Sequence, residues 1–322
     1  MNRNKLSPFI HGNDSVTMIH FDLFAALLPL IIISVVQNGL RVLVMCFLSA
    51  ISSYVVELLG NLIKGNFKPF QMRVCILSIC ITLLCPITVP IWMPAAGSVF
   101  ATLLVRVILS DNYKKLFMTP AIGWLFLLSI WPKEMMTYPL YNSNENFPIF
   151  ANIENFDVGI TISHYLQFSQ KPPYRMLDIL AGLYSGGMGT TCVAAILLIA
   201  IYFIVRRSIA WQVPLSMICT VSVFALFINR AGVSPLYSII YELASSSFIF
   251  VAIFIAGDLI NAPKLPLSRV LFGITLGVVM MFLRYFGLYE HSIAFALVIV
   301  NLFADLLDML TIKLRIKKVQ NY

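Results

Sequence analysis

The sequence has few charged residues. Asp, Glu, Lys and Arg together make up 11% of its 322 residues, whereas soluble globular domains average about 25%. So few charges cannot cover a compact, water-facing surface, which excludes an ordinary cytosolic enzyme, and the 60% hydrophobic content excludes a disordered chain. With a mean hydropathy of +0.90, the composition predicts an all-α integral membrane protein.

The sequence also lacks the motifs of common enzymes. It contains no Gly-x-Ser-x-Gly, no His-Glu-x-x-His and no Walker phosphate loop, and His164 and His291 have no matching partners. We therefore predict no catalytic residue and no metal ligand. The cysteines lie in apolar stretches without a histidine or a second cysteine pair to complete a metal site, which favours free, buried thiols. They are Cys46, Cys75, Cys80, Cys85, Cys192 and Cys219.

The net charge of +8 is typical of two classes of protein. A basic protein can bind nucleic acid, but here Lys and Arg lie at the ends of apolar runs, where they orient membrane helices. We therefore predict contact with the lipid bilayer and no nucleic-acid partner. No cleavable secretory signal is visible, because the first 19 residues are polar and mixed.

Apolar runs of about 17–25 residues predict membrane-spanning helices. Short or broken helices persist at membrane depth only where protein buries them or where they line a cavity. The sites at Pro86, Pro90, Pro94 and Pro120 are therefore candidates either for a ligand or ion path or for kinked packing helices. We predict about ten spans, at 20–36, 42–63, 72–88, 91–109, 120–132, 188–205, 209–228, 236–256, 268–286 and 291–311.

Ten crossings place both termini on one side of the membrane, which we take as the cytoplasm. On that assumption fifteen of the 22 Lys and Arg residues are cytoplasmic, five are external, and Arg106 and Arg284 lie within spans. This three-to-one bias agrees with the positive-inside rule. The sequence thus predicts a multi-pass protein of the cell membrane with both termini cytoplasmic.

A long external loop divides the predicted spans into two sets of five. Because most connections between packed helices have 2–8 residues, so long a loop indicates a functional segment. Five spans per half force the halves into opposite orientations, as in inverted repeats, and residues 97–106 weakly resemble residues 273–284. The predicted regions are a cytoplasmic N-terminal segment 1–19, a first membrane half 20–132, an extracytoplasmic loop 133–187, a second membrane half 188–312 and a basic cytoplasmic tail 313–322.

Ionisable side chains within the predicted spans need a reason to be there, because lipid does not solvate charge. Arg106 and Arg284 lie deepest, and each requires either a carboxylate in a structural ion pair or an anionic ligand or cofactor. Asp22, Glu57 and Asp308 lie near helix ends and could reach the interface. The full set is Asp22, Glu57, Arg106, Glu242, Asp258, Arg284, Asp305 and Asp308.

Residues 186–192 read Gly-Gly-Met-Gly-Thr-Thr-Cys at the start of the sixth predicted span. Backbone amides that no side chain blocks, at Gly187 and Gly189, could bind an anion or the polar edge of a ring, with hydroxyl donors from Thr190 and Thr191. The alternative is close helix packing at small residues. Thr119, followed by a proline near the first turn of its helix, marks a second polar helix start.

These stretches resemble the RnfD/NqrB family, the membrane subunits of Rnf and sodium-pumping NADH:quinone reductase complexes. Residues 186–192 and 206–214 are similar to the family's Gly-x-x-Gly-Glu-Thr-Ser and Ser-Trp-Arg-Ile-Pro stretch, and residues 119–123 to its Asn-Pro-Ala-x-x-Gly. Asp258 corresponds to its Thr-Asp-Pro, and residues 284–301 follow its Arg-x-x-Gly-x-x-Glu-Gly-x-x-Phe-Ala-x-x-x-x-Asn. The resemblance covers nearly the whole chain.

The resemblance implies ten helices in two inverted halves, an FMN joined through phosphate to a threonine of the outer loop, and a second flavin in the membrane. One departure concerns the covalent link. When residues 155–166 are aligned on their glycine, the family's acceptor position holds His164, which has no hydroxyl, while Thr161 and Ser163 are hydroxyls out of register. The sequence therefore favours non-covalent FMN or riboflavin over covalent FMN.

The leading functional interpretation is a membrane subunit of an Rnf/Nqr-like electron transport complex, a translocase that couples flavin-mediated electron transfer to Na⁺ or H⁺ movement. Its partners would be the other membrane subunits. The resemblance implies flavin contacts at the glycine and threonine positions named above, and a cation such as Arg284 or Arg106 beside the reduced ring. The cofactor-binding candidates are Gly187, Gly189, Thr190, Thr191, Arg284, Arg106 and Thr119.

Two other interpretations involve no redox chemistry in this chain. The same inverted-repeat scaffold could form a permease, with the proline-broken helices around a substrate site near the membrane midplane. The chain could also be a flavin-free structural subunit whose partners hold every cofactor. The absence of the acceptor threonine favours both of these over a flavoprotein.

Overall fold

The computed structural model describes residues 16–65, 71–109, 118–141, 147–150, 156–287 and 289–320. These residues form an almost entirely helical protein with one small two-stranded sheet. Most of the predicted segment 1–19, several Asn and Glu residues of the loop 133–187, and the end of the tail 313–322 lie outside the described residues.

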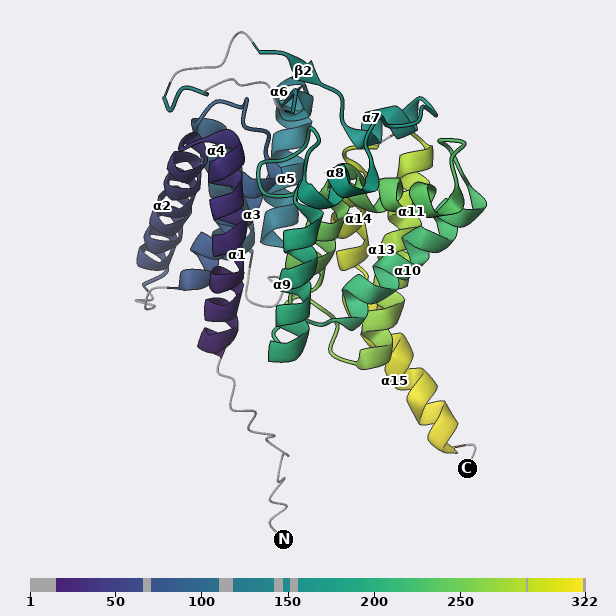
Figure 1. Ribbon diagram of the computed structural model, residues 1–322. Helices are drawn as coiled ribbons and strands as arrows, with labels where there is room; N and C mark the ends of the chain where they lie inside the picture. Colours follow the sequence, from purple (N-terminus) through teal and green to yellow (C-terminus); the bar gives the residue numbers. More distant parts are fainter. Residues whose placement is uncertain are drawn as a thin grey trace.

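The helices of the first half stand side by side (Figure 1). The first two are long because their apolar runs contain no helix-breaking pair, while the third ends just before Cys85-Pro86, since proline disfavours helix in the residue that precedes it. The fifth begins with Pro120 in its first turn, where a missing N–H costs nothing. These helices are α1 (Val16–Asn38), α2 (Arg41–Ile63), α3 (Met72–Leu84), α4 (Trp92–Thr102) with the π-helical turn η1 (Leu103–Ile108), and α5 (Thr119–Ile130).

The outer loop is built from short elements at one end of the molecule (Figure 1). Two strands pair antiparallel, with Tyr138 opposite Gly159. The loop elements are α6 (Pro132–Met136), β1 (Tyr138–Pro139), β2 (Val158–Gly159), α7 (Ile162–Gln167) and α8 (Met176–Ala181).

The second half repeats the sequence of long helices, but two of its segments are broken. Residues 235–256 bend at a serine turn, and α14 and α15 meet at an angle of 51°. The helices are α9 (Val193–Arg206), α10 (Gln212–Phe227), α11 (Pro235–Ala244), α12 (Phe248–Phe250) with the π-helical turn η4 (Val251–Ala256), α13 (Pro266–Tyr285), α14 (Ser292–Asn301) and α15 (Ala304–Gln320).

Each of the ten predicted segments coincides with one helix or a broken pair. Among the described residues, four helices are long and apolar enough to cross a membrane, or five if the bent pair α14–α15 counts as one span. The other five segments are shorter apolar helices. The prediction of an all-α membrane protein is confirmed at this level.

The core lies between the helices, and its contacts depend on small residues. A Cβ at Gly123 of α5 would lie 2.9 Å from the carbonyl oxygen of Gly97 in α4, and a Cβ at Gly273 of α13 would lie 2.6 Å from the carbonyl oxygen of Val213 in α10. Side chains at these positions would push the helix backbones apart. Glycines therefore set the close approach of α4 to α5 and of α10 to α13.

We predict that Gly273→Ala destabilises the protein by about 1–3 kcal/mol, because the added methyl meets a backbone carbonyl that cannot move alone. The thermal unfolding midpoint of the purified protein in detergent measures the effect. Val278→Ala on the same helix is the control, since Val278 is 40% exposed on the outer surface of the bundle. An unchanged midpoint for Gly273→Ala would contradict the proposed helix contact.

Candidate functional site

A turn of three serines breaks the helix between α11 and α12. Ser246 and Ser247 both have left-handed backbone angles, with φ of 52° and 55°. Such angles are unfavourable for residues with a side chain and persist only where surrounding contacts hold them. All backbone groups of such a break at membrane depth must find partners within the protein.

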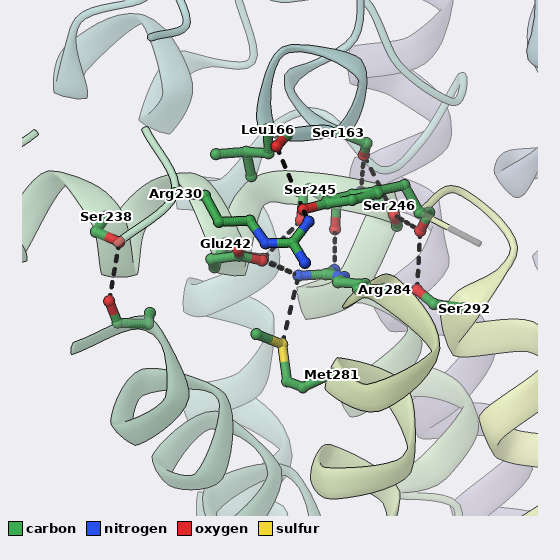
Figure 2. A network of polar contacts seen from close by, with 12 residues as sticks. Ser163, Leu166, Arg230, Ser238, Glu242, Ser245, Ser246, Met281, Arg284 and Ser292 are labelled. Atoms are coloured by element: carbon green, nitrogen blue, oxygen red, sulfur yellow. Dashed lines mark hydrogen bonds and ion pairs between the residues drawn. The ribbon is translucent and has the colours of Figure 1, made fainter. Parts of the chain in front are cut away.

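Arg284 of α13 holds the end of α11 at this break (Figure 2). Its Nη1 donates to the carboxylate of Glu242 at 2.5 Å and to the carbonyl oxygen of Glu242 at 2.9 Å. Its Nη2 donates to the carbonyl oxygen of Ser245 at 3.2 Å. Arg284 is fully buried and Glu242 is 2% exposed, so the pair neutralises two charges that lipid and protein cannot solvate.

The serine turn also binds the outer loop (Figure 2). The backbone N–H of Ser246 donates to the hydroxyl of Ser163 in α7 at 2.9 Å, and the Ser246 hydroxyl donates to the carbonyl oxygen of Tyr289 at 2.7 Å. The hydroxyls of Ser247 and Thr190 lie 2.8 Å apart. Three segments distant in sequence therefore meet at one polar point inside an apolar bundle.

A small enclosed cavity lies at this point, which we call the inner chamber. Its volume is about 20 Å³, enough for about one water molecule. Hydroxyl groups dominate its wall, with a single carboxyl from Glu290. The lining polar residues are Tyr138, Thr161, Ser163, Tyr184, Ser185, Thr190, Ser245, Ser246, Ser247 and Glu290.

Glu290 lies in the connection between α13 and α14, outside the helices, and is partly buried. The Thr161 hydroxyl donates to its Oε1 at 2.5 Å. Burial raises the pKa of Glu290, and this effect exceeds the opposing hydrogen bonds from Thr161 and Ser163. The carboxyl therefore binds a proton more tightly than an exposed glutamate does.

A second, open cavity of about 350 Å³ lies on the other side of Glu290, and we call it the outer cavity. Glu290 and Thr161 line both cavities, so they form the wall between them. The volume is at the lower end of the range for small-molecule sites. The lining residues are Met136, Val158, Gly159, Ile160, Thr161, His164, Gln167, Gly287, Tyr289, Glu290 and His291.

The glycine stretch predicted as an anion site is tightly packed. The backbone N–H of Met188 donates to the carbonyl oxygen of Cys85, and that of Gly189 to the carbonyl oxygen of Leu83, each at 3.0 Å. A Cβ at Gly187 would lie 2.8 Å from the Leu84 carbonyl oxygen. These two amides are used by the chain itself, and the small residues give close contact with α3.

The remaining predicted site residues lie apart from one another. Gly187 and Thr190 line the inner chamber, whereas Thr191 lies beside the Gln37 side chain, with 3.4 Å between their oxygens. Thr119 is buried in the first turn of α5.

Arg106 pairs with Glu57 of α2 at 2.8 Å and also donates to the side chain of Gln71. The structural ion pair, one of the two alternatives for the deep arginines, is therefore present at both Arg106 and Arg284. Neither arginine lines the inner chamber or the outer cavity.

The hydroxyls near the predicted acceptor position face different spaces. Ser163 is 1% exposed, and its hydroxyl bonds to the serine turn. Thr161 caps α7 by accepting the N–H of His164 at 3.3 Å. His164 is exposed, contacts the ring of Phe168, and lines the outer cavity.

Comparison with known proteins places this chain. A family model described as "NQR2, RnfD, RnfE family" matches residues 3–317. The chain belongs to the NQR2, RnfD, RnfE family. The resemblance noted in the sequence is therefore confirmed.

Curated relatives align over nearly their whole length. The RnfD-type component of the Na(+)-translocating ferredoxin:NAD(+) oxidoreductase complex of Acetobacterium woodii is 25% identical, covering 95% of this chain and 92% of that protein. The corresponding components of the ion-translocating oxidoreductase complexes of Haemophilus influenzae (strain PittEE) and Actinobacillus succinogenes are 26% and 23% identical, each over 95% of both chains.

In this member of the NQR2, RnfD, RnfE family, the ionisable groups within the apolar segments form ion pairs. Asp22 and Glu57 are buried, at 5% and 7% exposure, rather than open to the interface. Asp308 accepts N–H groups at the start of α13, and Asp305 is exposed. Among the described residues the pairs are Arg73–Asp258, Arg106–Glu57, Arg206–Asp22 and Arg284–Glu242.

Sequence reasoning missed the serine turn and Glu290 in this family member. The run Ser245-Ser-Ser247 inside an apolar segment was a visible signal, because three consecutive hydroxyls are unusual in a membrane helix. Glu290 gave a weaker signal, since a carboxylate at a helix connection normally faces water. Only the fold shows that it lies between two cavities.

We predict that Arg284→Met destabilises this protein by about 3–5 kcal/mol, because it leaves the Glu242 carboxylate buried and unpaired. The double variant Arg284→Met/Glu242→Leu should lose less than either single variant. Thermal unfolding of the four proteins gives the coupling free energy. Arg206→Met is the control, since the Arg206 side chain is 46% exposed and its loss should have a much smaller effect. Additive single and double effects would contradict this assignment.

Proposed function

We propose that this protein is the RnfD-like membrane component of an Rnf-like electron transport complex, which couples flavin-mediated electron transfer to the translocation of Na⁺ or H⁺. The observation that carries the proposal is the family match over residues 3–317 together with relatives that align from end to end. On this proposal its partners are the other membrane subunits of the complex.

We infer that the chain crosses the membrane ten times in two inverted halves. The packing supports this, because α2 contacts α3 and α4 in the first half, while α10 contacts α11 and α13 in the second. Likewise α4 contacts α5, and α13 contacts α14. The start of α1 and the end of α15 lie at the same end of the molecule, opposite the outer loop (Figure 1). This favours cytoplasmic termini and an extracytoplasmic loop.

The outer cavity fits a flavin better than the inner chamber does. A space of about 20 Å³ is too small for a three-ring molecule, whereas about 350 Å³ is within the range of small-ligand sites. Its wall combines the apolar side chains of Met136, Val158 and Ile160 with polar groups, as ligand sites usually do. FMN or riboflavin bound there would supply one-electron transfer.

In that position a non-covalent flavin would contact His164, Tyr289 and the Thr161 hydroxyl from this chain. Ser163 is a poor attachment point, because its hydroxyl is buried and bonded to the serine turn. The glycines and threonines of residues 187–191 and both deep arginines would contact a ring only after local opening of their packing.

Purification of the tagged protein from its native membranes tests the proposed assembly. We expect other membrane subunits of an oxidoreductase complex to co-purify, and membranes that lack the gene to lose ion-coupled electron transfer. An unrelated tagged membrane protein from the same cells is the control. A protein that purifies alone and transports a substrate into proteoliposomes without partners would support a permease instead.

The flavin assignment is tested by visible absorbance and by fluorescence in denaturing gels. We expect purified protein from flavin-replete cells to absorb in the flavin bands and to release the flavin on denaturation, giving a dark gel band. His164→Thr introduces a hydroxyl at the wall of the outer cavity and should give a fluorescent band in cells that attach FMN to proteins. Colourless wild-type protein would contradict the cofactor assignment.

A further inference from the structure

The wall between the two cavities contains a carboxyl that has no cationic partner among the described residues. Their four ion pairs do not include Glu290. Its neighbours are instead hydroxyls, with Thr161 donating to Oε1 at 2.5 Å and Ser163 facing the same chamber. A carboxyl that only neutral donors contact, and that protein largely encloses, is poorly placed to hold a negative charge.

The charged and titratable groups around Glu290 come from several elements. His164 of α7 and His291 share the outer cavity with it, and Arg284 of α13 acts from beyond the serine turn. The phenols of Tyr138 and Tyr184 face it across the inner chamber. Arg284 is neutralised by Glu242 at 2.5 Å, so its field at Glu290 is largely cancelled.

Hydroxyl groups continue inward from Glu290. Ser163 lies 3.2 Å from the Ser246 hydroxyl, and Thr190 lies 2.8 Å from the Ser247 hydroxyl, around a space that holds about one water. Hydroxyls and a water both donate and accept hydrogen bonds, which is the property needed to hand on a proton. Outward, Glu290 faces the open cavity directly.

We propose that Glu290 is a proton-exchange residue on the outer side of the protein, holding a proton between the outer cavity and the inner chamber. The protonated carboxyl gives its proton to a water of the outer cavity, leaving a carboxylate that the Thr161 and Ser163 hydroxyls stabilise, and the reverse step restores the acid. The exchange needs no cofactor. Its use in ion translocation rests on the proposed function.

Infrared spectroscopy of the purified full-length protein in lipid nanodiscs tests this proposal. Between pH 5 and pH 9 we expect the carbonyl band of a protonated carboxyl to persist at neutral pH and to convert to a carboxylate band as the pH rises. Glu290→Gln should remove this band. Glu134→Gln is the matched control, since Glu134 is an exposed carboxylate of the same outer region and should leave the band unchanged. Identical spectra for wild type and Glu290→Gln would overturn the proposal.

Two further variants decide the matter if Glu290→Gln fails to accumulate. Thr161→Val removes a donor to the charged carboxylate and should move the titration midpoint upward by roughly one pH unit. Thr161→Ser keeps the hydroxyl and should leave the midpoint near the wild-type value. Equal midpoints for the two variants would contradict the role of this hydrogen bond and hence the proposal.

Salt identity separates a proton site from a metal-ion site. We expect the same midpoint in NaCl and in KCl, because only protons exchange at this carboxyl. A midpoint that falls in NaCl alone would overturn the proposal in favour of Na⁺ binding by the same oxygens. The spectra need neither a flavin nor a partner subunit, so failure here leaves the proposed electron-transfer role standing, and the reverse also holds.

Discussion

The ion pair between Arg284 and Glu242 is the contact on which the polar interior of this protein depends. A buried guanidinium without a carboxylate would be too costly at membrane depth, and so would the reverse. The pair does more than neutralise charge, because the same guanidinium donates to the carbonyl oxygens of Glu242 and Ser245. It thereby satisfies the end of α11 and allows the chain to break there.

The break in turn creates the chemistry of the site. Two serines with left-handed backbone angles turn their N–H and hydroxyl groups toward the outer loop, where Ser163 accepts one of them. The outer loop is thus joined to the membrane helices by polar contacts at their interior. A small hydroxyl-lined chamber results on one side of Glu290, and an open cavity on the other.

The site residues illustrate two different kinds of glycine and arginine. The glycines of residues 186–189 looked like an anion site, yet their neighbours are the carbonyls of α3, so they serve close packing. The two deep arginines required carboxylates, and each has one, Glu57 or Glu242. A sequence shows that a buried arginine needs an anion, but a protein carboxylate and a bound ligand satisfy that need equally well.

Hydropathy and proline positions were enough to place the helical segments, because the length of an apolar run and the effect of proline on the preceding residue are local properties of the chain. The order of short motifs was enough to place the family. Only the tertiary structure decided the partners of the polar groups. Arg284 and Glu242 are 42 residues apart in sequence, Ser163 and Ser246 are 83 apart, and Thr161 and Glu290 are 129 apart. Contacts across such separations depend on how the helices pack, and no local pattern encodes them.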